Sequence, residues 1–393
     1  MIIHPVKTEA SRERVRISAR VECEGRPLPV DVLWFEFPGS SSEWFSSCPD
    51  GFVVALLLLA MSRREDIEVC GTLDRRLLSN LAEYQRIFQA WFPERFEPVD
   101  ICCTGVRVAE SKGRPTGVGS AFSGGADSSY TLWSHLPEHE PDPARRITHA
   151  LFVHGFDIPL ADVSTFETAS NLYDTELRAL GIELVVARTN IRQFVDALPW
   201  ELMHGSSLGS VALMLDRLLG LFYLPSSSSY TDLDPWGSHP VSDPLMSTDT
   251  LALIHDGSMA RCDKIARVSQ WAPARSWLRV CWERPDASVN CCRCYNCVMT
   301  MVSLELAKVL DQCPTFPMAL QRQRIRGLRL PLEDWLDTET TMQRAAASGR
   351  MDIVRDLRAA LWLSRLRHRL WPLRSLLKSV RRRLDSADQP HGT

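Results

Sequence analysis

The sequence predicts an α/β protein built around a parallel sheet, with a small α+β region before it and a helical region after it. Three observations carry this prediction. Short apolar segments alternate with amphipathic helical segments through residues 117–312, the pattern of strand–helix–strand crossovers. Residues 1–112 mix a β-hairpin pattern with helical segments, and residues 313–393 are helical in composition. We therefore expect three domains with these bounds, the first two joined by a linker at residues 111–117.

In the first region, β-rich residues flank the Gly25-Arg26-Pro27 break and predict a hairpin over residues 15–24 and 29–37. The remaining elements expected there are helices at residues 52–62 and 74–91 and strands at residues 66–70 and 99–103.

The second region repeats strand, loop and helix. Ser164 and Glu167 have the spacing of a capping box and predict a helix start, and Gly181 predicts the end of that helix. The other elements expected are strands at residues 118–122, 148–153, 183–187 and 221–224 and helices at residues 128–136 and 208–219. Strands that alternate with helices in this way imply a parallel sheet.

The third region predicts a helix over residues 340–361, with a break at Gly349, and a basic helix over residues 361–384. A solvated amphipathic helix packed on the body explains the second pattern, as does a contact for RNA, an acidic partner or a membrane surface. Homodimer formation stays open. The cations in question are Arg365, Arg367, Arg369, Arg374, Lys378, Arg381, Arg382 and Arg383.

Composition excludes several classes of protein. Hydrophobic residues make up 45% of the 393 residues and charged residues 24%, which argues against global disorder. The 45 basic and 48 acidic residues give a net charge of −3, so no global excess of positive charge marks a nucleic-acid-coating protein. Residues 1–30 have no signal-peptide pattern, and the longest apolar run is about half a bilayer span. We therefore expect a cytoplasmic protein without a transmembrane segment, whose thiols stay reduced.

The segment Ser123-Gly124-Gly125-Ala126-Asp127-Ser128-Ser129 lies between a predicted strand and a predicted helix. Glycines let a backbone fold tightly around a phosphate, serines add hydroxyl donors, and a helix N-terminus attracts an anion. An ordinary turn is the alternative. The segment lacks the Gly-Lys-Ser/Thr ending of a Walker A loop. It therefore predicts a phosphate loop of another kind, in which Asp127 holds Mg²⁺ or positions the nucleotide.

This segment resembles the SGGxDS signature of the PP-loop ATP pyrophosphatase superfamily, whose members cleave ATP between the α and β phosphates and adenylate a substrate. The resemblance implies the adenine nucleotide alpha hydrolase-like fold, with ATP and Mg²⁺ as cofactors. It also makes Asp127 and Ser128 the candidate catalytic residues. The residues implied to bind ATP are Ser123, Gly124, Gly125, Asp127, Ser128, Ser129, His154 and Gly155.

Five of the twelve cysteines fall between Cys281 and Cys297. Cys281, Cys291, Cys294 and Cys297 have gaps that let four thiols face one ion, which predicts a structural zinc site; an iron–sulfur cluster and redox or sulfur-carrying cysteines are the alternatives. Cys292 is out of register and is expected to be a spectator. We expect the cysteines of the first region to be buried small hydrophobes.

The cysteine cluster is similar to the zinc site of 7-cyano-7-deazaguanine synthases, with Cys292 in place of a glycine of their Cys-Gly-x-Cys-x-x-Cys core. Together with the phosphate loop, it makes residues 117–312 most similar to that branch of the superfamily. The expected function is adenylation of a carboxylate or amide of a small-molecule or peptide substrate, with release of AMP and pyrophosphate and formation of an amide, nitrile or thioamide. RNA thiolation and a non-catalytic nucleotide-binding partner protein are the alternatives.

Polar and aromatic residues between the two motifs are candidates for substrate contact, because loops at the carboxyl ends of parallel strands bind ligands. Arg261 and Lys264 could balance phosphate charge or bind a substrate carboxylate, with surface ion pairing as the alternative. The candidate substrate residues are Trp236, His239, Asp243, Arg261 and Lys264.

Overall fold

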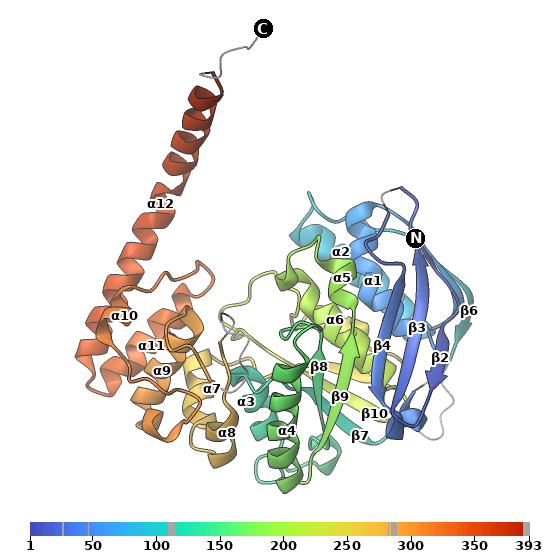
Figure 1. Cartoon of the computed structure of the whole chain (residues 1–393), viewed down its shortest axis with the longest axis horizontal. Helices are drawn as coiled ribbons and strands as arrows, with labels where there is room; N and C mark the ends of the chain where they lie inside the picture. Colours follow the sequence, from blue (N-terminus) through green and yellow to red (C-terminus); the bar gives the residue numbers. More distant parts are fainter. Residues whose placement is uncertain (26, 46, 109–114, 282, 284–288, 388–393) are drawn as a thin grey trace.

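The computed structural model describes residues 1–25, 27–45, 47–108, 115–281, 283 and 289–387, with side chains as far as Leu370. It shows an α/β fold around one mostly parallel sheet, compatible with a Rossmann-like arrangement (Figure 1). The predicted α/β class is confirmed. The described strands are β1 (Ile2–Ile3), β2 (Lys7–Ala10), β3 (Arg14–Glu22), β4 (Val32–Pro38), β5 (Ile67–Asp74), β6 (Ile101–Arg107), β7 (Gly117–Ala121), β8 (His149–His154), β9 (Glu183–Thr189), β10 (Leu219–Pro225) and β11 (Ala252–Asp256).

The parallel half of the sheet has the order β11-β10-β7-β8-β9. The chain runs from β7 through β8 to β9 on one side and then returns to place β10 and β11 on the other. The order of the sheet therefore reverses beside β7, and ligands bind at such a switch point, outside the carboxyl ends of the strands. Both faces of β7 and β8 are buried, as expected for central parallel strands.

The predicted hairpin is confirmed: β3 and β4 are antiparallel, with Ile17 opposite Phe35. Strand β4 also pairs with β9, so the hairpin continues the parallel half as a single sheet. The sheet thus crosses the boundary expected near residue 112, and the three-domain division stays a prediction. The expected linker at residues 111–117 lies for the most part outside the described residues.

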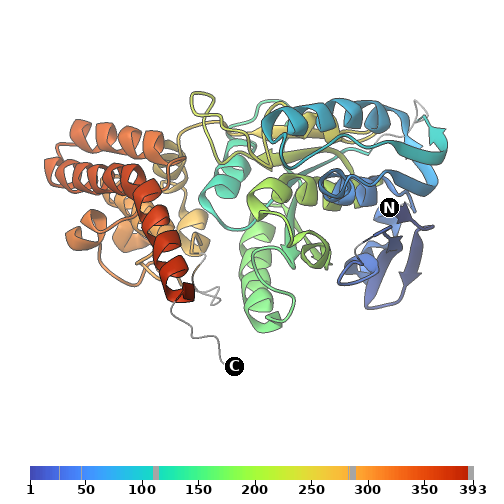
Figure 2. The same cartoon turned by 90° about the horizontal axis from the view of Figure 1, so that it is seen from above.

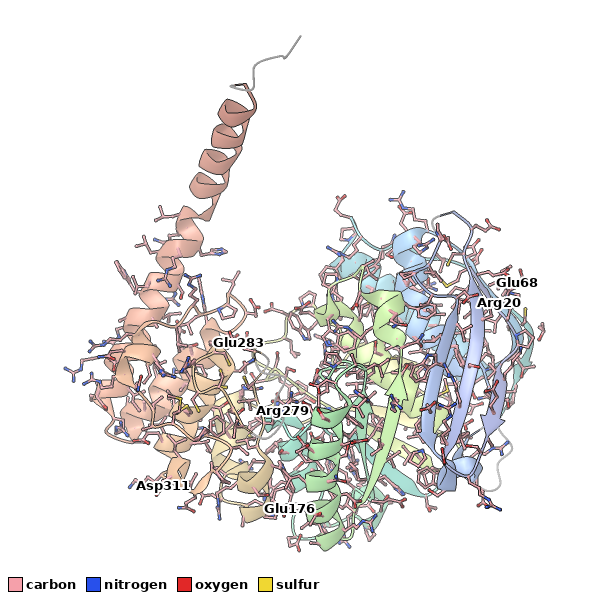
Figure 3. All side chains as sticks on the ribbon, in the orientation of Figure 1. Arg20, Glu68, Glu176, Arg279, Glu283 and Asp311 are labelled. Atoms are coloured by element: carbon pink, nitrogen blue, oxygen red, sulfur yellow. The ribbon has the colours of Figure 1, made fainter. Side chains whose placement is uncertain are left out.

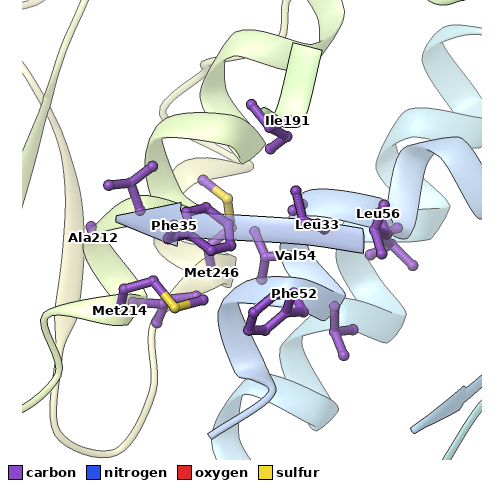
Figure 4. Close-up of a cluster of buried hydrophobic side chains, with 14 of the residues drawn as sticks. Leu33, Phe35, Phe52, Val54, Leu56, Ile191, Ala212, Met214 and Met246 are labelled. Carbon is purple, nitrogen blue, oxygen red and sulfur yellow. The ribbon is translucent and has the colours of Figure 1, made fainter. Parts of the chain in front are cut away.

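Helices cover the sheet on both faces (Figure 2). The uniformly apolar α1 packs against α6, and a substituent on Gly51 would collide with Met214 and with the carbonyl oxygen of Ser210. Figure 4 shows side chains of β4, α1, α5 and α6 in this core. The helices up to the cysteine cluster are α1 (Asp50–Arg63), α2 (Arg75–Trp91), α3 (Ala126–Ser134), α4 (Val163–Ala179), α5 (Ile191–Val195), α6 (Trp200–Met214), α7 (Arg261–Val268) and α8 (Ala272–Trp277).

The starts of α4 and α6 differ from the prediction, and the helix predicted from residue 340 begins at Trp335. The N-cap of α4 is Asp162, whose carboxylate accepts from the Thr165 N–H at 3.2 Å, and not Ser164. A carboxylate two residues earlier therefore replaces the expected capping box. Helix α6 spans Trp200–Met214 instead of the predicted residues 208–219, and a turn at residues 215–218 separates it from β10. Its small and apolar residues are buried on nearly all sides, so no amphipathic pattern marks its ends. Strand β11 was not predicted.

The C-terminal helices form a separate group beside the sheet (Figures 1 and 2). They are α9 (Tyr295–Leu306), α10 (Arg322–Arg326), α11 (Trp335–Ala347) and α12 (Met351–Ala387). The expected break falls at Gly349, whose φ of 72° is left-handed.

Helix α12 packs on α10 and α11 and then projects from the body (Figure 1). Trp362, Leu366 and Leu370 are exposed on it, and the expected cations from Arg374 onward lie beyond the described side chains. The partner, RNA and homodimer expectations for this helix stay predictions. In the part of the chain that the structure describes, none of the helices is both long and apolar enough to cross a bilayer.

Candidate functional site

The predicted phosphate loop turns sharply from β7 into α3. Gly124 has a φ of 70°, and a Cβ there would collide with the phenol of Tyr173. Tyr173 Oη donates to the carbonyl oxygen of Ser123 at 3.0 Å, and burial raises the pKa of Tyr173 to about 12, so the phenol stays protonated. The turn therefore requires glycine at position 124, and α4, which carries Tyr173, holds the loop from outside.

Serine hydroxyls tie the loop together from inside. Ser123 Oγ accepts from the Gly125 N–H at 3.3 Å, and Ser128 Oγ accepts from the Ser123 N–H at 3.2 Å. Ser129 Oγ accepts from the indole N–H of Trp277 at 3.0 Å. The loop and the first turn of α3 are thus preorganised, and a preorganised loop at a helix N-terminus suits an anion.

Asp127 lies in the first turn of α3 and pairs with two cations from α7. Arg261 donates to one carboxylate oxygen at 2.6 Å, and Lys264 donates to the other at 3.0 Å. Burial alone would raise the pKa of Asp127, but Lys264 and Arg261 hold that pKa below its usual value. The structure therefore brings three predicted site residues together, and surface ion pairing does not describe them because Lys264 is fully buried.

Further contacts fix the two cations. The Lys264 ammonium also donates to the carbonyl oxygen of Ser226, just past β10, and the Arg261 backbone N–H donates to Asp337 of α11 at 3.0 Å. The site thus joins the loop after β7, the end of β10 and the C-terminal helices.

Two adjoining pockets are lined in part by the phosphate loop. The polar pocket, of about 400 Å³, is lined by Gly125, Arg261, Arg279 and Glu283 among others. The aromatic pocket, of about 280 Å³, is lined by rings that include Phe152, Phe156, Trp200, His204 and Trp236. Both pockets share the side chains of Ser123, Asp127, Ser128, Asp157 and Ser227.

Sequence reasoning missed Asp157 and Arg279. Asp157 follows β8, and its position past the carboxyl end of a parallel strand was a usable signal. It is exposed to both pockets, yet the atoms around it are close enough to desolvate the carboxylate and raise its pKa, which Arg279 partly offsets. Arg279 belongs to no local motif, and only the tertiary fold places it in the polar pocket.

Other protein groups surround His154 and Gly155 closely. His154 Nε2 lies 2.9 Å from the carbonyl oxygen of Pro159, and its ring stacks on Phe166 at 4.3 Å between centroids. At Gly155, where φ is 105°, a side chain would collide with the carbonyl oxygen of Thr189. Among the described residues, their neighbours Val153, Phe156 and Asp157 line the aromatic pocket instead.

The remaining predicted substrate residues divide into two groups. Trp236 lines the aromatic pocket, beside His204. His239 and Asp243 are buried below it: Asp243 accepts from Ser238 at 2.6 Å and lies 2.7 Å from His255 Nδ1. His239 contacts the Trp91 ring. These two residues brace the loop that carries Trp236.

The four predicted metal ligands converge. The sulfur atoms of Cys281, Cys291, Cys294 and Cys297 all lie within 4.8 Å of one another, so the cluster could hold a metal ion such as zinc. Four sulfurs around zinc lie about 3.8 Å apart for a tetrahedron with bonds of about 2.3 Å, so only a small contraction is needed. A hydrogen bond from Cys297 is the main cause that lowers the pKa of Cys294 to about 5, which leaves a thiolate ready to bind a cation.

The other cysteines show one correction. Cys292 is buried and out of register, with its sulfur directed at the carbonyl oxygen of Asn290. In the first region, the expectation of buried thiols is wrong: Cys102 is exposed, and Cys23, Cys70 and Cys103 are only half-buried. Cysteines near the edge strands and loops there meet too few neighbours for full burial.

The polar pocket also offers carboxylates suited to Mg²⁺. Mg²⁺ is commonly held by one or two carboxylates together with substrate phosphates. Asp127 and Asp157 line the same pocket, and Asp157 has no hydrogen-bond partner in the described part of the chain. Asp157 therefore offers a free carboxylate that fits the ion in kind, whereas both Asp127 oxygens are bonded to Arg261 and Lys264 and Asp127 could join only after one of these cations moved away.

Comparisons with protein-family models, with curated proteins and with solved structures each found no match to this chain. What the site does is therefore inferred from its own residues.

Proposed function

We propose that this protein is a PP-loop ATP pyrophosphatase that adenylates a carboxylate or amide of its substrate and releases pyrophosphate and then AMP. One observation carries the proposal: the Ser123–Ser129 loop lies at the reversal of the strand order and lines two adjoining pockets. That position suits a nucleotide whose triphosphate crosses the loop.

The two pockets suggest a division of roles. The aromatic pocket is lined by several rings, Trp236 among them, and aromatic rings suit the stacking of a nucleobase. The polar pocket offers Arg261 and Arg279 for phosphate or a substrate carboxylate. Asp127 and Ser128 line both pockets, so the α phosphate of a nucleotide that occupied both would lie near them.

In the proposed reaction, an oxygen of the substrate carboxylate or amide attacks the α phosphorus of ATP. The bond to the bridging oxygen breaks, and pyrophosphate leaves with that electron pair. From an adenylated carboxylate, a nitrogen nucleophile attacks the activated carbon, loses a proton and displaces AMP, giving an amide. An adenylated amide gives a nitrile when it loses AMP together with its N–H proton, or a thioamide when a sulfide nucleophile displaces AMP. Mg²⁺, when bound, would neutralise charge that develops on the leaving phosphates.

This chain's residues would act mainly by orientation and charge. The loop N–H groups and the N-terminus of α3 would stabilise the leaving pyrophosphate. Asp127 would keep Arg261 and Lys264 in place until phosphate charge arrives. The zinc would stabilise the loop of residues 281–297 and take no direct part in the reaction.

The test is product analysis with ATP and a panel of carboxylates, peptides, ammonium and RNA. We expect AMP and pyrophosphate in equal amounts, and loss of both in Ser128→Ala. The matched control is Ser134→Ala on the same helix, whose hydroxyl bonds only the Thr131 carbonyl among the described residues. Tight ATP binding without AMP for any substrate would instead support a non-catalytic nucleotide-binding protein, and AMP formed only with RNA would support thiolation.

A further inference from the structure

Arg279 is a cation of the polar pocket that forms no ion pair with a described carboxylate, although its charge reaches Asp157 across the pocket. Arg261 and Lys264 are both paired with Asp127, whereas the Arg279 side chain has no hydrogen bond or ion pair to any described residue. Its Nε atom is buried and unsatisfied. A buried guanidinium N–H without an acceptor is costly, so a ligand anion is the natural partner.

The backbone around Arg279 holds the phosphate loop. The Arg279 N–H donates to the carbonyl oxygen of Gly124 at 2.9 Å, and the Trp277 indole donates to Ser129 at 3.0 Å. The segment of residues 277–281 therefore touches the loop at its left-handed turn and again in the first turn of α3. Figure 3 shows Arg279 at the junction between the sheet and the C-terminal helices.

The same segment ends at a predicted metal ligand, Cys281. Asn290, next to Cys291, is fully buried and binds the same segment through its side chain. Its Oδ1 accepts from the Val280 and Cys281 N–H groups at 2.9 and 3.1 Å, and its Nδ2 donates to the Leu278 carbonyl at 2.9 Å. Two of the four thiols are thus tied to the segment that carries Arg279.

We propose that Arg279 is an anion-binding residue of the phosphate pocket and that metal binding by the four cysteines and anion binding at the loop strengthen each other. The coupling runs through residues 278–281 and the Asn290 side chain. The inference rests on the proposed function, because the anion is taken to be the phosphate chain of ATP or pyrophosphate. Coupling between sites is reciprocal, so each ligand raises the affinity for the other by the same factor.

The first test measures binding of inorganic pyrophosphate, with Mg²⁺, to the zinc-loaded protein by calorimetry. We expect Arg279→Met to weaken binding about tenfold or more, since a charge-assisted hydrogen bond is lost. The control is Arg293→Met, which removes an exposed cation of the cysteine loop that lies outside the described lining of both pockets. Its affinity should match that of wild type.

The outcomes separate the two claims. If the wild type binds neither pyrophosphate nor ATP, the proposed function fails. If the wild type binds pyrophosphate and Arg279→Met binds it equally well, the role of Arg279 is overturned while the proposed function stands.

The second test measures zinc affinity by titration against a chromophoric chelator, with and without an ATP analogue that has a methylene group between the α and β phosphates. We expect the analogue to tighten zinc binding to the wild type by about fivefold or more, the lower end of typical coupling. The same titration is made with Arg279→Met, which we expect to bind the analogue weakly. Any change in its apparent zinc affinity then measures direct chelation of zinc by the analogue. An unchanged zinc affinity in the wild type would refute the coupling without any variant.

Asn290→Ala tests the route of the coupling, because it keeps all four thiols and Arg279. We expect this variant to bind zinc and pyrophosphate, each more weakly, with a coupling factor close to one. Wild-type coupling in this variant would show that the Asn290 tether does not transmit it.

Discussion

Asp127 is the residue at which the charges of the site meet, because two cations from α7 share its carboxylate. Lys264 is fully buried, and removing the carboxylate would leave its ammonium without a counter-charge. The residue therefore has a structural as well as a proposed catalytic role, and a test must separate the two.

We expect Asp127→Asn to abolish AMP release and to lower the free energy of unfolding by about 3 kcal/mol, as breaking a buried ion pair does. The double variant Asp127→Asn with Lys264→Met should recover part of that stability but no activity. Denaturant unfolding and product analysis measure the two effects. Wild-type AMP release in the single variant would show that the reaction occurs elsewhere.

Gly124 offers a second residue-scale test, because its left-handed backbone lies against Tyr173. We expect Gly124→Ala to weaken pyrophosphate binding at least about tenfold, because the loop must shift to relieve the collision. Gly181→Ala is the matched control: φ is 73° there, but a Cβ would meet nothing within 4 Å. Gly181→Ala should lower stability by about 1 kcal/mol, because alanine is strained in a left-handed conformation, and should leave pyrophosphate binding intact. Equal binding losses in both variants would contradict the proposed close packing.

At the scale of elements, four thiols of the cysteine loop converge on one point, and Cys292 is not among them. We expect one zinc per chain in the purified protein, and its loss in Cys294→Ser, because three sulfurs bind zinc much more weakly than four. Cys292→Gly should keep its metal and lose little stability, because Cys292 has a strained φ of 56°. Elemental analysis measures the metal. If the purified protein instead contains iron and absorbs visible light, the four cysteines hold an iron–sulfur cluster and not zinc.

Asp334 is the N-cap residue of helix α11, and burial and the neighbouring Glu333 raise its pKa to about 6. In the unfolded chain the pKa is about 3.9, so the folded state binds more protons between these values. The contribution of Asp334 to stability therefore rises as pH falls from 7 to 4. We expect wild type to gain about 1 kcal/mol relative to Asp334→Asn over that range, given the partial exposure of the carboxylate. Denaturant unfolding at several pH values checks this, and a constant difference would contradict the raised pKa.

Most elements could be predicted because their signals are local. The hairpin turn, the apolar run of α1 and the Gly181 stop each reflect a few neighbouring residues. Prediction failed for α6 because that helix is buried on nearly all sides and shows no amphipathic pattern. At α4 two residues could form the cap, and the carboxylate of Asp162, just before the expected capping pair, is the one that does.

At the scale of the whole molecule, the site shows the same division. The phosphate loop and the cysteines carry their spacing in the sequence, whereas Arg279 reaches the pocket only because its segment is bound at Gly124 and at Asn290. Arg261 and Lys264 lie 134 and 137 positions after Asp127 in the sequence, and no local pattern connects residues so far apart. Long-range pairing was thus the missing information.

The continuity of the sheet makes a prediction about folding. Asn190, buried at the end of β9, accepts from the Trp34 N–H at 3.0 Å and donates to the Val32 carbonyl at 2.9 Å. It therefore ties the hairpin to the parallel half, and one hydrophobic cluster spans both. We infer that neither part is stable alone, because removing the hairpin would leave β9 as an edge and expose the α1 side of α6.

We accordingly expect residues 117–393 expressed alone to show no cooperative unfolding transition, and full-length Asn190→Ala to unfold in one transition shifted by about 2 kcal/mol. The shift follows from two buried backbone groups that lose their partner. Secondary structure and tryptophan fluorescence, followed together in denaturant, should give coincident curves for wild type and for the variant. Two separate transitions in the variant, or a cooperatively folding fragment, would instead mean that the boundary near residue 112 divides independent domains. In that case the metal-linked phosphate site would belong to a core that folds without the hairpin.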